Sequence, residues 1–452
     1  MRRGKQEPII RSGLDIGTRK ISLIVTETDP LSSEMQVIAV GSARARGISK
    51  GDIQDPDLVV ESIRRAVDEA ETAFDLNIRD TFLAVGPSSA SVFRLEHRFP
   101  LREEGTPERP VTGKDMKDAV KGAVRVAREK GKELLVHAIP LGYSVDSGFP
   151  VRDPRGLKGS VLTVEVLFIG LPEEGVRRSI TCAEKAGLKI LGVVHKSIAS
   201  AFGSLSEEEI IDGAVAVDIG AGTSTVTCVR DGTIRDVSIF PGGGDLVTQD
   251  VAKLLMIPTS KAEYLKREIS LFEDPCDLQD ELEFDLDGEP FVATVQDVLD
   301  IVFPRMEEIL FDFLSPRIEE FGQEKFLRSI VFSGGVACAR GFLDLVNDNF
   351  DIPVRIGGPV NSMSLPPQAR GCEFASTVGI VNYLLEREAH PEILLEPCLA
   401  ELTGAPDDEQ SMDILILDPR RSVATRTRKG NRGKGPMDGF IDALKNAFRE
   451  LF

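Results

Sequence analysis

A carboxylate followed at once by a glycine turn occurs near the middle of the chain. The apolar run Ala214 to Val217 ends at Asp218, and Gly220-Ala221-Gly222 then leads into the β-rich segment Thr223 to Val229. This pattern predicts a strand, a tight turn and a second strand. Backbone N–H groups at such a turn can converge on phosphate oxygens, and the carboxylate can hold a hydrated Mg²⁺ ion. A plain β-hairpin with a surface aspartate fits this one segment equally well.

The same pattern occurs near the start of the sequence. Asp15 is followed by Gly17 and Thr18, and then by the alternating run Ile21 to Val25. Two copies of one pattern predict an internal duplication, because a single glycine turn arises by chance far more easily than a pair. We therefore expect two related domains, each with a hairpin that could hold phosphate.

Two further glycine segments add to this interpretation. Gly242-Gly243-Gly244 precedes a predicted helix, and a glycine loop at a helix N-terminus is an anion-binding arrangement. Ser333-Gly334-Gly335 follows the predicted strand Ser329 to Phe332, and a glycine pair lets a ribose or a ring approach the backbone. Each segment alone also fits an ordinary loop. The helix after the first loop is predicted to have Asp245 as its N-cap and an apolar face of Leu246, Val247, Val251, Leu254 and Leu255.

Composition limits the classes of function. The chain has 452 residues, which predicts two or more domains, and a formal charge of −19, which argues against general nucleic-acid binding. Seven cations and no acid lie between Arg420 and Lys434, so an acidic body is followed by a basic tail. The six cysteines are scattered without a paired motif, which predicts reduced thiols and a cytoplasmic location. No stretch is long and apolar enough to span a membrane.

The character of the sequence changes between the two hairpins. A helix over Lys114 to Lys130 and strands near Leu134 to Ile139 and Leu162 to Ile169 predict a small inserted α+β unit. We predict a first domain over 1–86 and 170–210, interrupted by an insert over 87–169. The second predicted domain covers 211–244 and 309–395, and an outlying subdomain covers 245–308. A linker over 396–435 and a terminal helix over 436–452 follow.

The last seventeen residues have the pattern of an amphipathic helix. Docking of this helix on the body is one interpretation, and binding at a membrane surface is the one we favour. Burial contributes roughly 1.5 to 3 kcal/mol per large apolar side chain, and each cation near an anionic leaflet adds about 1 kcal/mol. We expect the helix to lie on the membrane surface. The residues predicted to enter the membrane are Phe440, Ile441, Leu444, Phe448, Leu451 and Phe452.

Together these features are similar to the actin, Hsp70 and sugar-kinase ATPase superfamily. Within it, the chain resembles the FtsA family of bacterial cell-division proteins. The specific evidence is the terminal helix together with the segments Leu134 to Gly148, Gly156 to Ile169 and Pro353 to Pro359. The resemblance implies an α/β, actin-like two-domain ATPase fold with an inserted α+β subdomain and a C-terminal amphipathic helix.

The resemblance also implies a function and a set of binding residues. It implies ATP and Mg²⁺ in a cleft, head-to-tail polymers formed through the insert, and tethering of FtsZ filaments to an anionic membrane at the division septum, on the cytoplasmic face of the inner membrane. It further implies recruitment of later divisome proteins, and docking of the FtsZ C-terminal peptide on subdomain 245–308. Asp15 and Asp218 match the metal positions. The positions matched or predicted for the nucleotide are Gly17, Thr18, Lys20, Gly220, Ala221, Gly222, Thr223, Ser224, Gly242, Gly243, Gly244, Glu263, Lys266, Gly334 and Gly335.

Two points are left open by the sequence. Glu263 and Lys266 match a helix that contacts adenosine in related proteins, but they could equally be a surface ion pair. Where many superfamily members have Glu or Gln to orient the attacking water, this chain has Val194-His195-Lys196-Ser197. His195 could take over, although a surface or core histidine is the interpretation we favour, so we expect slow hydrolysis. The alternative functions are an actin-like pilus-assembly protein and a small-molecule kinase.

Overall fold

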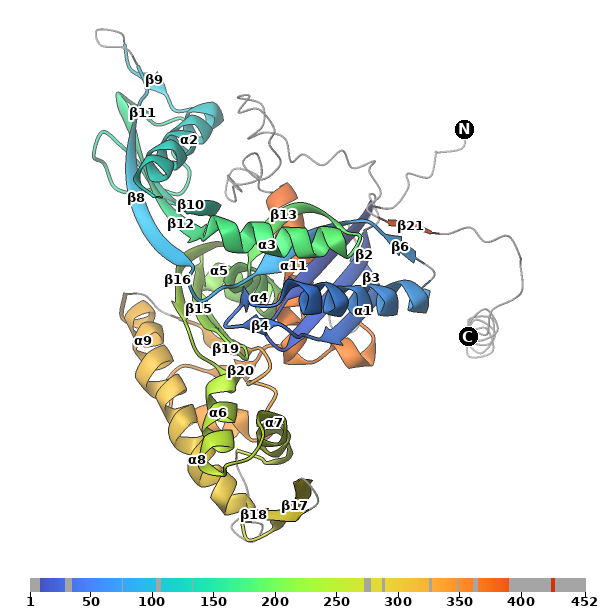
Figure 1. The fold of residues 1–452 in the computed structure, drawn as a ribbon. Coiled ribbons are helices and arrows are strands. Elements are labelled where there is room, and N and C mark those ends of the chain that lie inside the picture. Colours follow the sequence, from blue (N-terminus) through green and yellow to red (C-terminus); the bar gives the residue numbers. More distant parts are fainter. Residues whose placement is uncertain are drawn as a thin grey trace, which may run out of the picture.

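Two five-stranded sheets of the same construction form the centre of the computed structural model (Figure 1). It describes residues 9–28, 35–74, 76–102, 107–131, 133–271, 278–286, 289–324, 327–347, 349–360, 365–389 and 424–426. The first sheet has the order β13-β7-β1-β2-β3 and the second β16-β15-β14-β19-β20. Their strands are β1 (Ile9–Ile16), β2 (Lys20–Thr28), β3 (Met35–Arg44), β7 (Asp80–Val85), β13 (Lys189–His195), β14 (Ala214–Ile219), β15 (Ser224–Arg230), β16 (Thr233–Phe240), β19 (Ser329–Ser333) and β20 (Val354–Ile356).

The duplication predicted from the two Asp-Gly patterns is visible in the strand pairing. β1 pairs with β2 antiparallel and with β7 in parallel. β14 likewise pairs with β15 antiparallel and with β19 in parallel. Each hairpin therefore lies inside its sheet, so the aspartate of each pattern is held by strands on both sides.

Two helices cross between the sheets and contact one another closely. They are α4 (Lys196–Ser204) and α11 (Ala375–Ala389), and α11 also packs on β1 and β2. A Cβ atom at Gly203 would lie 1.8 Å from the carbonyl oxygen of Ala375, and one at Gly379 would lie 1.7 Å from that of Ala199. The helices thus meet backbone to backbone, which only glycine at these two positions permits.

The insert is a three-stranded sheet covered by one helix. Its strands are β8 (Ser91–Pro100), β10 (Leu134–Val145) and β12 (Val161–Leu171), in the order β10-β12-β8, and α2 (Gly113–Lys130) packs on β8 and β12. α2 begins with a capping box in which Thr112 and Asp115 exchange hydrogen bonds. The insert forms the upper left end of the molecule in Figure 1. The short strands β9 (Arg109–Pro110) and β11 (Lys158–Gly159) pair beyond this sheet.

The insert also contacts the second domain. Arg94 Nη2 lies 2.7 Å from Asp236 Oδ2, and Arg235 Nη1 donates to the carbonyl oxygen of Leu141 at 2.8 Å. Arg152 donates to the carbonyl oxygen of Asp231. All three second-domain residues lie on β16 or in the turn that precedes it, so the insert is held by both domains.

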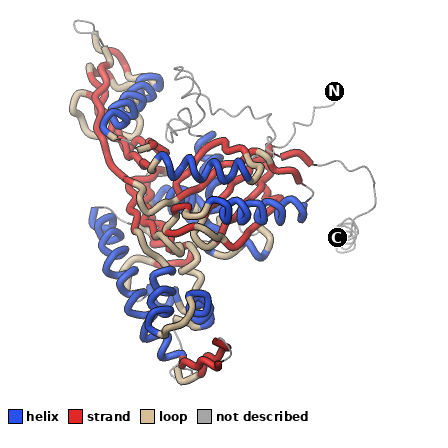
Figure 2. The backbone as a smooth tube through the Cα atoms, in the orientation of Figure 1, coloured by secondary structure: helices blue, strands red, loops and turns tan. Residues whose placement is uncertain are grey.

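The outlying part of the second domain is mainly helical, as Figure 2 shows. Two predictions on α6 are wrong in detail: Gly243 is the N-cap instead of Asp245, and Leu254 is 62% exposed although it was expected on the buried face. This part contains α6 (Gly244–Leu254), α7 (Thr259–Glu268), β17 (Glu281–Leu286), β18 (Glu289–Thr294) and α8 (Val295–Glu307), followed by a π-helix (Glu308–Leu314) and α9 (Ser315–Glu324).

The remaining described elements are short or peripheral, except for two helices that cover the first sheet. No helix among the described residues is long and apolar enough to cross a membrane. The described residues exclude most of the predicted linker and all of the predicted terminal helix. The residues predicted to enter the membrane are therefore also outside them: Phe440, Ile441, Leu444, Phe448, Leu451 and Phe452. The other elements are α1 (Pro56–Phe74), α3 (Glu173–Lys185), α5 (Glu207–Asp212), α10 (Phe342–Asn347), β4 (Ile48–Ser49), β5 (Asp52–Ile53), β6 (Leu76–Ile78), β21 (Ala424–Arg426, paired with β6) and the 3₁₀ helices Pro367–Ala369 and Cys372–Phe374.

Candidate nucleotide site

The turns of the two hairpins face each other. Asp15 lies near the end of β1 and Asp218 near the end of β14. A Cβ atom at Gly222 would lie 2.7 Å from Thr18 Oγ1, so the two turns are in contact. Arg19 Nε lies 2.6 Å from Asp245 Oδ1, which ties the first turn to α6 of the second domain. The structure therefore brings together the two patterns that the sequence places far apart.

The second turn and the loop before α6 form one backbone cradle. Gly244 N–H donates to Gly220 O at 3.0 Å, and Asp245 N–H donates to Ala221 O at 2.8 Å. Ser224 Oγ donates to Gly242 O at 2.7 Å. Any side chain on Gly243 would collide, because a Cβ atom there would lie 2.2 Å from Gly220 O.

The two glycines that follow β19 have different surroundings. Gly334 has a φ angle of +89°, and a Cβ atom there would lie 2.5 Å from Ile219 O and 2.7 Å from Asp218 Oδ1. Ser333 Oγ donates to Asp218 Oδ1 at 3.3 Å. Gly335 has nothing within 4 Å of its would-be Cβ. Gly334 thus supports Asp218 directly, whereas Gly335 borders open space.

The two carboxylates have different partners. Asp15 is 3% exposed; its Oδ1 lies 2.7 Å from Lys196 Nζ, and its Oδ2 accepts from Ser376 Oγ at 2.5 Å. Asp218 is less buried than Asp15, because part of its surface is exposed to solvent. Burial raises the pKa of Asp218, and the positive charge of Lys196 opposes that rise. A cation at Lys196 therefore acts on both aspartates.

Lys20 is also part of this charge cluster. Its Nζ donates to the carbonyl oxygen of Glu373 at 2.6 Å and lies 3.3 Å from the centre of the Phe374 ring. Burial lowers the pKa of Lys20 to about 8, and the nearby Asp15 and Glu373 carboxylates oppose that change. Lys20 links the first hairpin to the 3₁₀ helix at the start of α11.

Glu263 and Lys266 are largely buried, so a plain surface ion pair does not describe them. Lys266 Nζ lies 2.7 Å from Glu263 Oε2 and donates to Thr248 Oγ1 at 2.8 Å and to Gly244 O at 3.1 Å. Burial acts to raise the pKa of Glu263, but Lys266, Thr248 and Arg267 together lower it to about 2. The pair therefore connects α7 to the glycine loop.

His195 is a core residue. It is fully buried, it is the N-cap of α4, and its Nδ1 lies 2.7 Å from Ser197 Oγ. Burial lowers its pKa to about 3. The adjacent Lys196 is the residue of this stretch that reaches Asp15. The sequence gives no local signal for this contact, because Asp15 lies far from Lys196 along the chain.

Cys338 and Cys372 are joined by a disulfide beside the Gly334-Gly335 pair. Gly334 N–H donates to Cys372 O at 3.2 Å. The prediction of reduced thiols is therefore wrong for this pair. Cys182 and Cys228 are buried and are not joined in a disulfide.

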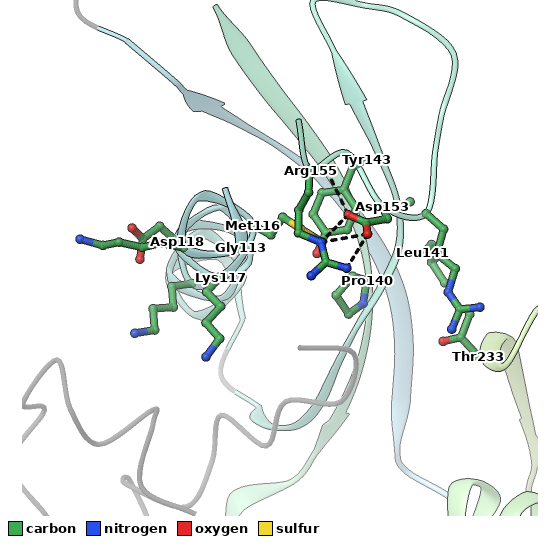
Figure 3. A pocket seen from close by; sticks show the side chains of 14 residues that line it. Gly113, Met116, Lys117, Asp118, Pro140, Leu141, Tyr143, Asp153, Arg155 and Thr233 are labelled. Carbon is green, nitrogen blue, oxygen red and sulfur yellow. Dashed lines mark hydrogen bonds and ion pairs between the residues drawn. The ribbon is translucent and has the colours of Figure 1, made fainter. Parts of the chain in front are cut away.

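A cavity of about 750 Å³ lies in the insert, away from the two aspartates. Figure 3 shows Lys117 and Met116 of α2 on one side and Pro140 and Tyr143 of β10 on the other. Asp153 and Arg155 form an ion pair at its edge. This cavity belongs to the insert and to a short part of β16, so its chemistry is separate from that of the hairpins.

Two family models match the chain. "Cell division protein FtsA" matches residues 215–379, and "SHS2 domain inserted in FTSA" matches residues 98–169. The cell division protein FtsA of Escherichia coli K12 is 28% identical over 403 residues, which cover 87% of this chain and 94% of that protein. The FtsA of Pseudomonas aeruginosa is 28% identical over 381 residues, covering 83% and 89%.

A solved structure agrees on the fold. A PilM–PilN type IV pilus biogenesis complex matches with a TM-score of 0.58 and 18% identity, over 83% of this chain and 98% of that chain. At this identity the likeness concerns the fold alone. The predicted fold class is confirmed: a mixed α/β, actin-like fold in which the SHS2 domain interrupts the first domain. The chain belongs to the FtsA family of cell-division proteins.

Proposed function

We propose that this chain is an ATP-binding, actin-like cell-division protein that polymerises and tethers FtsZ filaments to the cytoplasmic membrane, where it helps to recruit later divisome proteins. The observation that carries the proposal is the pair of facing hairpins, with Asp15 and Asp218 on either side of one glycine cradle, in a member of the FtsA family.

ATP binding is supported by the shape and charge of the cradle. The Gly220–Gly222 turn and the Gly242–Gly244 loop are hydrogen-bonded into one backbone surface that only small residues allow. Lys20 and Lys196 supply positive charge beside it. We place the phosphates between the hairpins and the adenosine toward the Glu263–Lys266 pair, with Gly335 at the open side.

The residues present fit Mg²⁺ unequally. Asp218 retains some exposed surface and can accept a hydrogen bond from a metal-bound water, because Mg²⁺ commonly keeps several of its waters. Both oxygens of Asp15 already have partners, Lys196 and Ser376. Mg²⁺ held at Asp218 would supply positive charge to the terminal phosphates.

ATP hydrolysis should be slow. The position that carries Glu or Gln in many superfamily members lies in a stretch whose histidine is buried and whose lysine pairs with Asp15. Neither group is arranged to take a proton from water. Purified protein with Mg²⁺-ATP should turn over well below about 1 s⁻¹. Turnover at ordinary enzyme rates that His195→Ala abolishes would contradict this expectation.

Self-association through the insert is supported by an exposed aromatic side chain. Phe149 follows β10 and is 94% exposed, and Leu157 in the same region is 45% exposed. A contact with a second copy of the chain would bury these side chains, and burial of large apolar side chains favours association. The neighbouring cavity offers a second feature for a partner to fill.

Docking of the FtsZ C-terminal peptide is supported by apolar side chains on subdomain 245–308. Leu254, Met256 and Tyr264 are 62%, 87% and 51% exposed. They lie on α6, just after it, and on α7. An apolar peptide could cover them, and burial of such side chains gives most of the free energy at many interfaces.

Membrane binding rests on the amphipathic pattern of residues 436–452 and the basic residues before it. The test is co-sedimentation with anionic liposomes, with and without ATP and FtsZ, of the full chain and of a chain that lacks 436–452. We expect the shortened chain to lose liposome binding and to retain nucleotide binding.

Point variants make this test sharper. Phe448→Gln on the apolar face should weaken liposome binding strongly, while Asn446→Gln on the polar face should leave it unchanged. Membrane association that persists without the tail would refute the tethering proposal.

Family membership favours cell division over pilus assembly or a small-molecule kinase.

A further inference from the structure

Lys196 pairs with Asp15, the aspartate of the first hairpin. Its Nζ is 2.7 Å from Asp15 Oδ1, and its side chain is 18% exposed. The positive charge of Lys196 also acts on the Asp218 carboxylate. One ammonium group therefore serves both carboxylates.

Two glycines lie against the Lys196 side chain. A Cβ atom at Gly86 would lie 3.0 to 3.2 Å from three carbon atoms of the Lys196 side chain. A Cβ atom at Gly17 would lie 3.1 Å from its Nζ. The stem thus runs along Gly86 and the ammonium group lies beside the first phosphate-type turn.

Helix stability does not account for a lysine at this position. Lys196 is the first residue of α4, where the helix dipole disfavours a positive charge. The cation is held there by Asp15, with which it makes a short, mostly buried ion pair. The negative charge of Asp15, and not the stability of α4, therefore accounts for a lysine at this position.

We propose that Lys196 is a built-in counter-cation of the nucleotide cleft, which lets the chain bind the polyphosphate of a nucleotide with only a weak requirement for Mg²⁺. This inference rests on the proposed nucleotide function. Without a cation, the two aspartates would repel a polyphosphate, and in many nucleotide sites a metal ion removes that repulsion. Here Lys196, together with Lys20, balances Asp15 and Asp218 before any metal binds.

The test compares nucleotide affinity with and without Mg²⁺. ATP binding to the full chain is measured by calorimetry in millimolar Mg²⁺ and in EDTA, for the wild type and for Lys196→Gln. We expect the wild-type Kd to rise by less than about tenfold in EDTA. For Lys196→Gln we expect a loss of about tenfold or more in EDTA relative to the wild type, and most of that loss should be recovered in Mg²⁺.

The matched control is Lys189→Gln, which removes an exposed lysine at the start of β13, just before α4. It should bind ATP as the wild type does under both conditions. Thermal unfolding of Lys196→Gln shows whether the variant is folded. If it is not, the wild-type comparison between Mg²⁺ and EDTA still decides.

Three results would overturn the inference, and they can be told apart. Wild-type binding that disappears in EDTA contradicts the counter-cation role and leaves the nucleotide function standing. An equal loss for Lys196→Gln in both conditions indicates a merely structural role. A wild type that binds no ATP in either condition refutes the nucleotide function itself.

Discussion

His137 and His195 are neighbours in the core next to α4. The backbone N–H of His195 donates to His137 Nε2 at 2.9 Å, and the Tyr383 hydroxyl lies 3.3 Å from His137 Nδ1. Burial lowers the pKa of each imidazole from 6.5 to about 3, and nearby positive charges act in the same direction. Both histidines are therefore neutral in the folded chain near neutral pH.

This pair predicts a pH-dependent stability. The histidines of the unfolded chain take up protons near pH 6.5, whereas those of the folded chain do not. The contribution of the neutral histidines to the free energy of unfolding is therefore complete above pH 6.5 and decreases as the pH falls toward 3. Each histidine contributes a slope of about 1.4 kcal/mol per pH unit within that window. Urea unfolding of the wild type at about pH 7.5 and about pH 5.5 measures the difference.

His137→Gln should be less stable at neutral pH but should show about half of the pH dependence of the pair. His97→Gln is the control, because His97 is partly exposed and its replacement should leave most of the slope in place. An unchanged slope in His137→Gln would show that the histidines do not cause it.

The glycine pair after β19 gives a second prediction at the residue scale. Gly334→Ala requires a left-handed backbone for alanine and places a methyl group against Ile219 O and Asp218 Oδ1. ATP affinity should fall by about tenfold or more, and the midpoint of thermal unfolding should decrease.

Gly335→Ala is the adjacent control, since its new methyl group meets no atom within 4 Å. We expect its fold to be unchanged. Equal affinity losses in both variants would mean that bulk near the nucleotide, and not support of Asp218, explains the effect.

The residues of the site show what sequence could and could not predict. Both aspartates and the glycine turns were found because the pattern of carboxylate, glycine and β-branched residues is local. Ser376 and Glu373 were missed because their partners, Asp15 and Lys20, are 361 and 353 positions away. Lys196 was missed for the same reason, since its partner Asp15 lies far from it along the chain.

At the scale of elements, α4 and α11 approach closely because each has a glycine where the backbone of the other helix lies. Gly379→Ala would place a methyl group 1.7 Å from Ala199 O, so the helices must move apart. We expect a loss of about 1 to 3 kcal/mol or more in the free energy of unfolding. Differential scanning calorimetry should show a lower midpoint.

Gly113→Ala is the control for this prediction. Gly113 is the first residue of α2 and has nothing within 4 Å of its would-be Cβ. Alanine is the better helix former, so stability should stay the same or rise slightly. A harmless Gly379→Ala would indicate that the two helices are not in backbone contact.

Elements with strong periodicity were predicted well, and those shaped by tertiary contacts less so. The predicted helix Lys114 to Lys130 agrees with α2 to within one residue. β8 was not predicted, although its apolar residues alternate with Arg94, Glu96 and Arg98, which is the pattern of a half-exposed strand. The N-cap of α6 was misplaced because Asp245, a typical capping residue, instead pairs with Arg19.

At the scale of the whole molecule, the proposed self-contact of the insert is testable through Phe149. Phe149→Ser removes a side chain that is 94% exposed, so it should leave folding and ATP binding intact. If the insert forms the polymer contact, the variant should bind lipid as the wild type does but should form no filaments on a lipid monolayer where the wild type forms them, as seen by negative-stain electron microscopy.

Ile211→Ser provides the comparison, because Ile211 is 53% exposed on α5 of the second domain, outside the insert. It should polymerise as the wild type does. Normal filaments of Phe149→Ser on lipid would show that this side chain is not part of the polymer contact.

The contacts of the insert with both domains have a mechanical consequence. Arg94 and Arg152 join it to β16 and the turn before β16, while its own strands continue from the first domain. A pulling force applied at the insert would therefore be shared between the two walls of the cleft. In a filament built through the insert, tension along the filament would change how long the nucleotide stays bound. The rate of nucleotide exchange would then depend on the mechanical load.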